Sequence, residues 1–255
     1  MDSLYLLQFG CFLFMVINAA YLLLGALHTQ WQNLRYEHSR HLIIVALLIL
    51  ALQYLAQMCL EIRATNDAYG ALVNALVYPV CFSFISIGIY HIEATHTRRR
   101  QLNIVSLGFC MAIWLVCVIG YELKGGPGEW LYVAQALFLS SVVYDIVMIT
   151  KEMRRRRNIL ETMAATDMLP YVRYSKASLF VLFAAALVMP IAIISTQLLL
   201  IVGPLVLIAL LFFIVTFQAL GNSYVPSEEL LDEEVERTVS LSPEEKKLGG
   251  RFLMR

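Results

Sequence analysis

Seven long apolar runs constrain this chain more than any other feature of its sequence. They cover residues 4–27, 41–62, 71–94, 104–123, 130–150, 177–197 and 203–222. Each is close to the roughly 20 residues that one helical bilayer crossing needs. Backbone N–H and C=O groups in hydrocarbon must be paired within a helix or a closed barrel, and runs this long without alternation indicate helices. The sequence therefore predicts an all-α, polytopic membrane protein with seven transmembrane helices.

The last two of these spans are separated by only a weak polar break. Apolar character runs almost without interruption from Ser178 to Leu220. The residues that offer a turn there are Ser195, Thr196, Gln197, Gly203 and Pro204. We expect the chain to reverse direction within this segment, so that 177–197 and 203–222 form separate helices.

The composition excludes several classes of protein. The 255 residues are 60% hydrophobic and 15% charged, against about 45–50% and about 25% in soluble domains. A water-soluble fold could not bury so much apolar surface, which excludes a soluble enzyme or a free nucleic-acid-binding domain. HExxH and GxSxG motifs are missing, so we predict that the chain is not an enzyme. The five cysteines have no CxxC or Cys/His spacing, and neither a metal nor another cofactor is predicted.

Basic residues distinguish the two sides of the membrane. They concentrate in the odd-numbered connections, as Arg35, Arg40, the arginines of 98–100 and those of 154–157. The even-numbered connections hold only Arg63 and Lys124. Because basic short loops stay in the cytoplasm, this distribution predicts an outward N-terminus, a cytoplasmic C-terminus and a place in the cytoplasmic (inner) membrane.

Polar side chains gather in the half of the bundle predicted to face outward. Gln53, Gln57 and Glu61 recur every fourth residue along the predicted helix 41–62 and are therefore expected to share one face of it. Polar groups inside a membrane mark functional sites by default. A pocket in the outer half of the bundle that is lined by such groups would suit a small ligand. The predicted ligand-binding residues are Gln53, Gln57, Glu61, Asn74, Tyr78 and Gln135. The alternative is that these amides tie helices together and that the tyrosines anchor the chain at the interface.

A second polar set falls at the predicted cytoplasmic end. We expect it to couple the bundle to an output, with carboxylates pairing arginines in one conformation and releasing them in another. Its members are His91, Glu93, Asp145, Arg98 and Arg154. Imidazole and carboxylate could also ligate a divalent ion there, but histidines hydrogen-bonded at the interface are the favoured interpretation, and no metal site is predicted.

The composition changes after the last apolar run. Residues 1–222 are predicted to form the bundle, and 223–255 an acidic cytoplasmic tail, largely disordered with short helical segments. The tail contains the acidic segment 225–237 and the helix start Leu-Ser-Pro-Glu-Glu-Lys-Lys at 241–247, close to Arg251 and Phe252. Serine before proline with acids behind it is a typical helix start.

Seven spans, an acidic linker and this helix start resemble the membrane half of bacterial membrane-anchored regulators of the AraC helix-turn-helix type. The resemblance implies an outward sensor that signals to a DNA-binding output. The sequence ends at Arg255, before a helix-turn-helix, so no direct contact with nucleic acid is expected in this chain. Two interpretations stay open: a shortened copy of such a regulator, or a protein that signals through a separate cytoplasmic partner.

These observations predict a membrane-embedded sensor. Its expected partners are the lipid bilayer, a small ligand of unknown identity and a cytoplasmic protein that binds residues 223–255, and homodimer formation is left open. The alternative is a small-molecule transporter or permease. A transporter needs polar groups along its whole path, whereas 42–52 and 83–90 are nearly all apolar, so the sensor is the favoured hypothesis.

Overall fold

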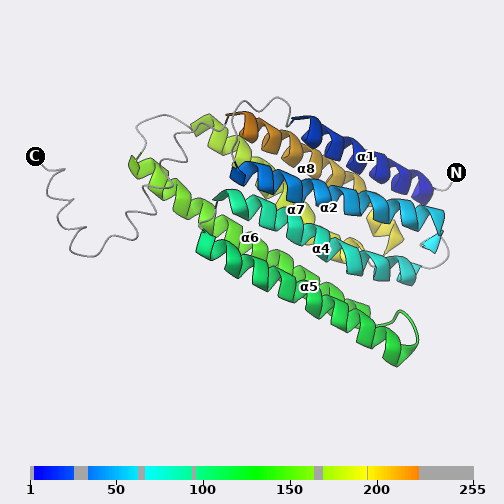
Figure 1. Cartoon of the computed structure of the whole chain (residues 1–255). Helices are drawn as coiled ribbons and strands as arrows, with labels where there is room; N and C mark the ends of the chain where they lie inside the picture. The colour runs from blue at the N-terminus through cyan, green and yellow to red at the C-terminus, as the bar shows by residue number, and fades with distance from the viewer. Residues whose placement is uncertain are drawn as a thin grey trace, which may run out of the picture.

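The computed structural model describes residues 3–25, 34–62, 67–93, 96–163, 169–193 and 195–223. Within these ranges the chain is all-helical, as predicted, and forms a bundle of long helices (Figure 1). The helices are α1 (Ser3–Gly25), α2 (Leu34–Cys59), α4 (Asp67–Glu93), α5 (His96–Lys124), α6 (Trp130–Met163), α7 (Leu169–Ala192) and α8 (Thr196–Ser223). The predicted acidic tail beyond Ser223 lies outside the described residues.

Six of these helices are long and apolar enough to cross a bilayer. The stretches that meet this criterion are Ser3–Gly25, Tyr36–Cys59, Asp67–Ile92, Arg100–Lys124, Trp130–Arg154 and Gln197–Ala219. In α7 the apolar part within the described residues, Ala177–Ala192, is shorter. The outer surface carries many exposed large apolar side chains, for example Leu52, Leu107 and Phe180. Such a surface is expected where lipid replaces water, and together with the six long apolar helices it indicates a multi-pass membrane protein.

The turn between α7 and α8 lies earlier in the chain than the sequence predicts. Helix α7 ends at Ala192 and α8 begins at Thr196, so the prediction that span six reaches residue 197 and that span seven begins at residue 203 is wrong. Gly203 and Pro204 both lie inside α8. Membrane helices tolerate proline because neighbouring helices and local adjustments satisfy the freed carbonyl, so Pro204 does not mark a helix start.

The chain runs up and down the bundle, and successive helices point in opposite directions (Figure 1). The end of the bundle that holds Ser3 also holds the C-terminus of α2 and the N-termini of α4, α6 and α8. We call it the Ser3 end and the opposite one the Ser223 end. Between α5 and α6 the reversal uses Gly125, whose φ of 67° suits glycine, and whose N–H bonds to the carbonyl of Tyr121 at 2.8 Å.

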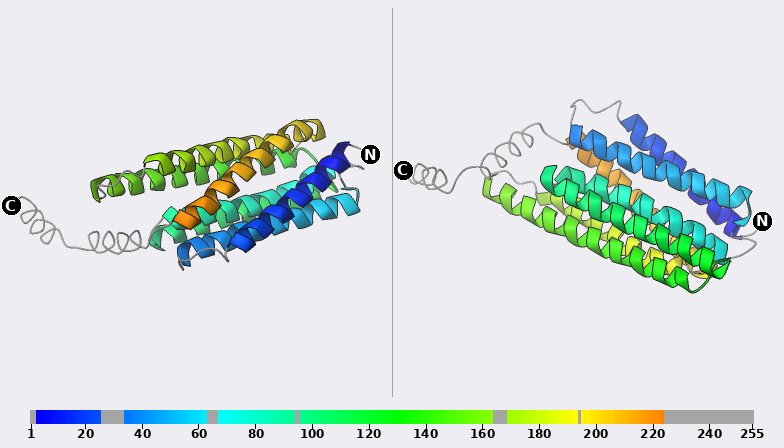
Figure 2. Two further views of the ribbon diagram at one scale, coloured as in Figure 1. Left: turned by 90° about the horizontal axis from the view of Figure 1, so that it is seen from above. Right: turned by 60° about the horizontal axis from the view of Figure 1, so that its bottom comes forward.

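Six of the helices close into a ring. The main contacts join α1 to α2, α2 to α4, α4 to α6, α6 to α7, α7 to α8 and α8 back to α1. Figure 2 shows α8 lying between α7 and α1. Helix α5 stands outside the ring and packs on α4 and α6, at the lower edge of the bundle in Figure 1. The ring therefore has an interior that α5 does not share.

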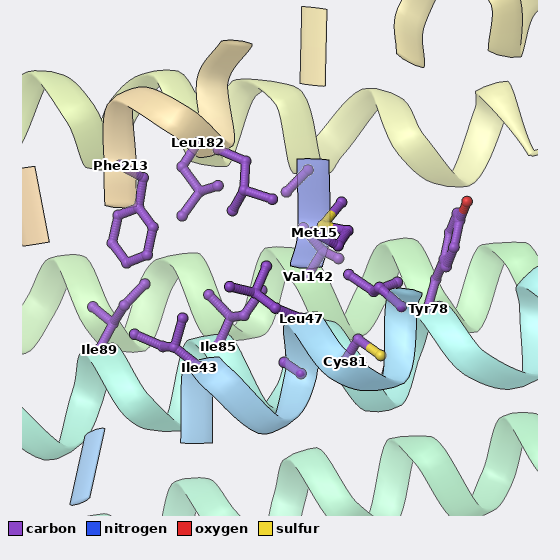
Figure 3. Close-up of a cluster of buried hydrophobic side chains, with 14 of the residues drawn as sticks. Met15, Ile43, Leu47, Tyr78, Cys81, Ile85, Ile89, Val142, Leu182 and Phe213 are labelled. Carbon is purple, nitrogen blue, oxygen red and sulfur yellow. The ribbon is translucent and has the colours of Figure 1, made fainter. Parts of the chain in front are cut away.

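Apolar side chains from the ring helices form the core. Figure 3 shows Met15, Leu47, Ile85, Val142 and Leu182 pointing between the helices, and these come from α1, α2, α4, α6 and α7. Close packing of α2 and α4 depends on a glycine. A Cβ placed on Gly88 would stand 3.1 Å from the carbonyl oxygen of Ser39, so a larger residue would require the two helices to separate by a few tenths of an ångström.

Candidate functional site

A cavity of about 90 Å³ lies inside the ring, and all six ring helices line it. Its walls are mostly apolar and include Met15, Leu50, Ile85, Phe138, Leu182 and Leu207. Polar groups also reach it, from Gln8, Tyr54, Gln57 and Tyr78. An apolar pocket with a few converging polar groups is the usual form of a small-molecule site. The cavity is therefore the candidate functional site.

The amides beside the cavity form one hydrogen-bonded network at the Ser3 end. Gln8 donates to the side-chain oxygen of Gln57 at 3.4 Å, and Gln57 donates to Oδ1 of Asn74 at 2.7 Å. Gln53 donates to that same oxygen. All four side chains are buried, Asn74 completely. Three helices, α1, α2 and α4, are thus joined by what we call the amide network, of which Gln8 and Gln57 reach the cavity.

A pair of tyrosines faces the cavity next to the amide network. The hydroxyls of Tyr54 on α2 and Tyr78 on α4 lie 2.8 Å apart, and the ring centroids are 6.5 Å apart. Both rings line the cavity. Tyr78 was predicted from its spacing to Asn74, whereas Tyr54 was missed. Tyr54 stands three residues before Gln57, on the same face of α2, and this spacing is the signal that could have found it.

Some atoms of the predicted ligand-binding residues keep hydrogen-bonding capacity. Oε1 of Gln53, Nδ2 of Asn74 and both amide atoms of Gln135 are buried and have no hydrogen-bond partner among the described residues. Buried polar groups are normally paired, and each exception asks for an explanation such as a ligand or an ion. Gln135 lies one turn before the cavity residue Phe138 but does not itself line the cavity or join the amide network.

The prediction that Glu61 shares a face with Gln53 and Gln57 is wrong. Helix α2 ends at Cys59, and Glu61 adopts a φ of 49° in the following turn, where its side chain is exposed. A four-residue spacing places side chains on one face only while the helix continues. The polar stripe of α2 therefore ends at Gln57.

The second predicted set is spread over the other half of the bundle. His91 stacks on His38 with ring centroids 5.1 Å apart, and Asn103 lies 3.5 Å from its Nε2. Asp145 is completely buried and accepts a hydrogen bond from the Ser106 hydroxyl at 2.9 Å. Asp145 is therefore hydrogen-bonded to a hydroxyl on α5. Among the described side chains, no arginine pairs with it.

The remaining members of that set are not brought into a cluster. Arg154 is exposed near the end of α6. The side chains of Glu93 and Arg98 lie outside the described residues. Within the described part of the chain, no three His, Cys, Asp or Glu side chains stand close enough to hold a metal ion together.

At the Ser223 end of the ring, described side chains of α2 and α8 pack against each other. Tyr36 stacks on Phe217 with ring centroids 4.9 Å apart, and its hydroxyl donates to the Phe217 carbonyl at 3.3 Å. Gln218 fills the space beside Gly25 on α1, where an added Cβ would collide with its amide. Polar groups therefore face the cavity from the Ser3 end, and packed side chains of α2 and α8 lie at the Ser223 end.

No protein-family model, curated protein or solved structure matches this chain.

Proposed function

We propose that this chain is a non-enzymatic membrane sensor that binds a small ligand in the ring cavity. The observation that carries the proposal is the amide network, which ends in an otherwise apolar cavity. Gln8 and Gln57 reach the cavity beside the tyrosine pair, and Gln53 and Asn74, which do not line it, each keep one amide atom of the same network unpaired within the described chain. Gln8 and Gln57 would hold the ligand directly, and Gln53 and Asn74 would fix the orientation of Gln57.

The ligand expected from these walls is an uncharged amphipathic molecule with an apolar body and one hydrogen-bonding head, such as an alcohol or an amide. The residues that line the cavity include no charged side chain, and a buried charge without a partner costs far more than a buried amide. The head would meet Gln8, Gln57 and the tyrosine pair, while the body would lie against the apolar walls.

The proposal includes a membrane orientation. We place seven spans in the cytoplasmic membrane with the Ser3 end outside, because the arginines at 35, 40, 98–100 and 154–157 belong to the parts of α2, α5 and α6 nearest the Ser223 end. The amide network would then stand near the external surface. Residues 224–255 would follow α8 into the cytoplasm and bind the output partner.

Signal transfer would follow from a population shift. Helix α8 contributes Leu199, Gly203 and Leu207 to the cavity and leads directly into the tail. A ligand that binds one arrangement of α8 better than another moves the bundle toward that arrangement. The ligand state would thereby change the position at which the tail leaves the bundle.

The test is thermal unfolding of the full chain in detergent with medium-chain primary alcohols and amides, compared with hydrocarbons of equal length. Wild type should gain several degrees in Tm with the polar-headed compounds, and Gln57→Leu should lose the gain. Ser140→Ala is the matched control, because Ser140 is exposed and bonds only within its own helix. Equal gains in wild type and Gln57→Leu would refute the ligand site, and flux through liposomes would indicate a permease.

A further inference from the structure

A buried carboxylate lies between α4, α5 and α6, outside the ring cavity. Asp145 on α6 is 0% exposed and falls within the apolar stretch Trp130–Arg154. Its Oδ1 accepts a hydrogen bond from Ser106 on α5 at 2.9 Å, and Ser86 on α4 also interacts with the carboxylate. Its other oxygen, Oδ2, is buried and has no hydrogen-bond partner within the described chain.

Among the described residues, the groups that interact with this carboxylate supply no positive charge. The titratable side chains near it are Cys110 from α5 and Tyr144 from α6. From α4, the Ser83 hydroxyl lies 3.3 Å from the sulfur of Cys110. The interactions of Asp145 with described residues thus involve hydroxyl and thiol groups, and none of them comes from a lysine, arginine or histidine.

A carboxylate in this position needs a positive charge to neutralise it, either a proton or a bound cation. An isolated buried charge costs several kcal/mol or more, and intramembrane carboxylates are retained where they bind ions or protons. A proton on Oδ2 would also neutralise the carboxylate, with a serine hydroxyl oxygen as its acceptor. A bound metal cation would instead use the free oxygen.

The chemistry of the site selects the cation. Its donors are carboxylate and hydroxyl oxygens, which are hard ligands. One carboxylate balances one positive charge, whereas a divalent ion would leave a net charge buried in an apolar interior. We propose that Asp145, with the hydroxyls of Ser86 and Ser106, binds Na⁺ at the junction of α4, α5 and α6.

The sodium site shares a helix with the ligand cavity. On α4, Ser83 and Ser86 face α5 and α6, while Phe82 and Ile85 face the cavity. A cation that draws α5 and α6 toward α4 would therefore restrict the helix that carries one wall of the cavity. The binding site itself does not depend on the proposed sensor function, and it can be tested without any organic ligand.

The experiment measures the Tm of the full chain in detergent while NaCl replaces choline chloride at constant ionic strength. Wild type should gain several degrees with a saturating Na⁺ dependence, and KCl should give a smaller gain. Asp145→Asn keeps the shape and the bond to Ser106 and should lose the Na⁺ dependence. Ser106→Ala keeps the carboxylate and should weaken Na⁺ binding, so the test does not depend on one variant folding.

Two control variants match these changes. Glu122→Gln removes an exposed carboxylate on α5, and Ser140→Ala removes an exposed hydroxyl on α6; both should keep the wild-type Na⁺ response. Equal stabilisation by Na⁺ and choline, or a Na⁺ response that survives in Asp145→Asn, would overturn the proposal. The proposal would also be overturned if Tm did not depend on Na⁺ but changed with pH in wild type and not in Asp145→Asn. A proton would then be the group that neutralises the carboxylate.

Discussion

The amide network and the Asp145 site are both polar groups buried in an apolar bundle, and they differ in what they need. Amides carry donors and acceptors, so Gln8, Gln57 and Asn74 satisfy much of one another's capacity without outside help. An ionised carboxylate can only accept hydrogen bonds, and the hydroxyls of Ser86 and Ser106 do not neutralise the charge of Asp145. The comparison teaches that a neutral polar cluster can join helices and still hydrogen-bond to a ligand, whereas a charged group also needs a proton or a cation to neutralise it.

The two regions are connected by α4. Asn74 and Tyr78 hold the amide network and the tyrosine pair near the Ser3 end of this helix, and Ser86 meets Asp145 further along. Helix α4 also packs on α2, α5 and α6. Substitutions on and around α4 can therefore break one region while leaving the other intact.

The largest effect is expected for Asn74→Leu. Oδ1 of Asn74 accepts from both Gln53 and Gln57, so its loss leaves two buried donors without an acceptor. Each unsatisfied group costs about 1–3 kcal/mol, and we expect the free energy of unfolding in mixed micelles to fall by about 3 kcal/mol. The Na⁺ response should persist. An effect no larger than that of Ser140→Ala would contradict the network.

Gly88→Leu should cost slightly less and disturb both regions. A side chain at this position meets the Ser39 carbonyl and the Ile43 side chain, so α4 must move away from α2. Overpacking of this kind costs about 2 kcal/mol. Unlike Asn74→Leu, this variant should reduce the response to alcohols and the response to Na⁺ together. Retention of both responses would show that the position of α4 does not couple them.

A smaller effect is expected for Ser106→Ala in the absence of Na⁺. The variant removes the hydrogen bond to Oδ1 of Asp145 while Ser86 still interacts with the carboxylate, and the lost bond costs about 1.5 kcal/mol. The unfolding free energy should be compared with that of Ser140→Ala, whose exposed hydroxyl bonds to the Ala136 carbonyl of its own helix. The response to alcohols should stay at the wild-type level, since neither Ser106 nor its helix α5 lines the cavity.

Ser140→Ala and Glu61→Gln should give the smallest changes. Both side chains are exposed, and surface substitutions usually alter stability by less than about 0.5 kcal/mol. Glu61→Gln further tests the end of the polar stripe. If Glu61 contributed to the ligand site, this variant would reduce the alcohol-induced gain in Tm; we expect the gain to be unchanged.

The sequence predicts the fold class and part of the site for physical reasons that can be named. Hydrocarbon imposes helices of about 20 residues, so the apolar runs locate the helices, and a spacing of four residues placed Gln53 and Gln57 on one buried face. The same spacing failed at Glu61 because the helix ends at Cys59. The position of a helix end depends on local turn geometry that periodicity does not encode.

Other features depend on tertiary packing. The closed ring and the position of α5 outside it follow from which helix faces meet, and uniformly apolar helices give little indication of this. Tyr54 was missed because a tyrosine within an apolar run looks like an ordinary core residue. Asp145 was recognised as notable, but its bond to Ser106 could not be predicted, because the two residues belong to helices whose relative rotation the sequence leaves undefined.

The most direct test of the central claim is to map where a photoreactive amphipathic probe attaches. The full chain in lipid nanodiscs would be illuminated with a diazirine-bearing medium-chain primary alcohol, and labelled peptides identified by mass spectrometry. We predict labelling of Met15, Phe82 and Met189 inside the ring, reduced by Ala186→Phe, which fills the cavity. Labelling confined to lipid-facing positions such as Leu107 and Leu115, with no change in Ala186→Phe, would contradict the account.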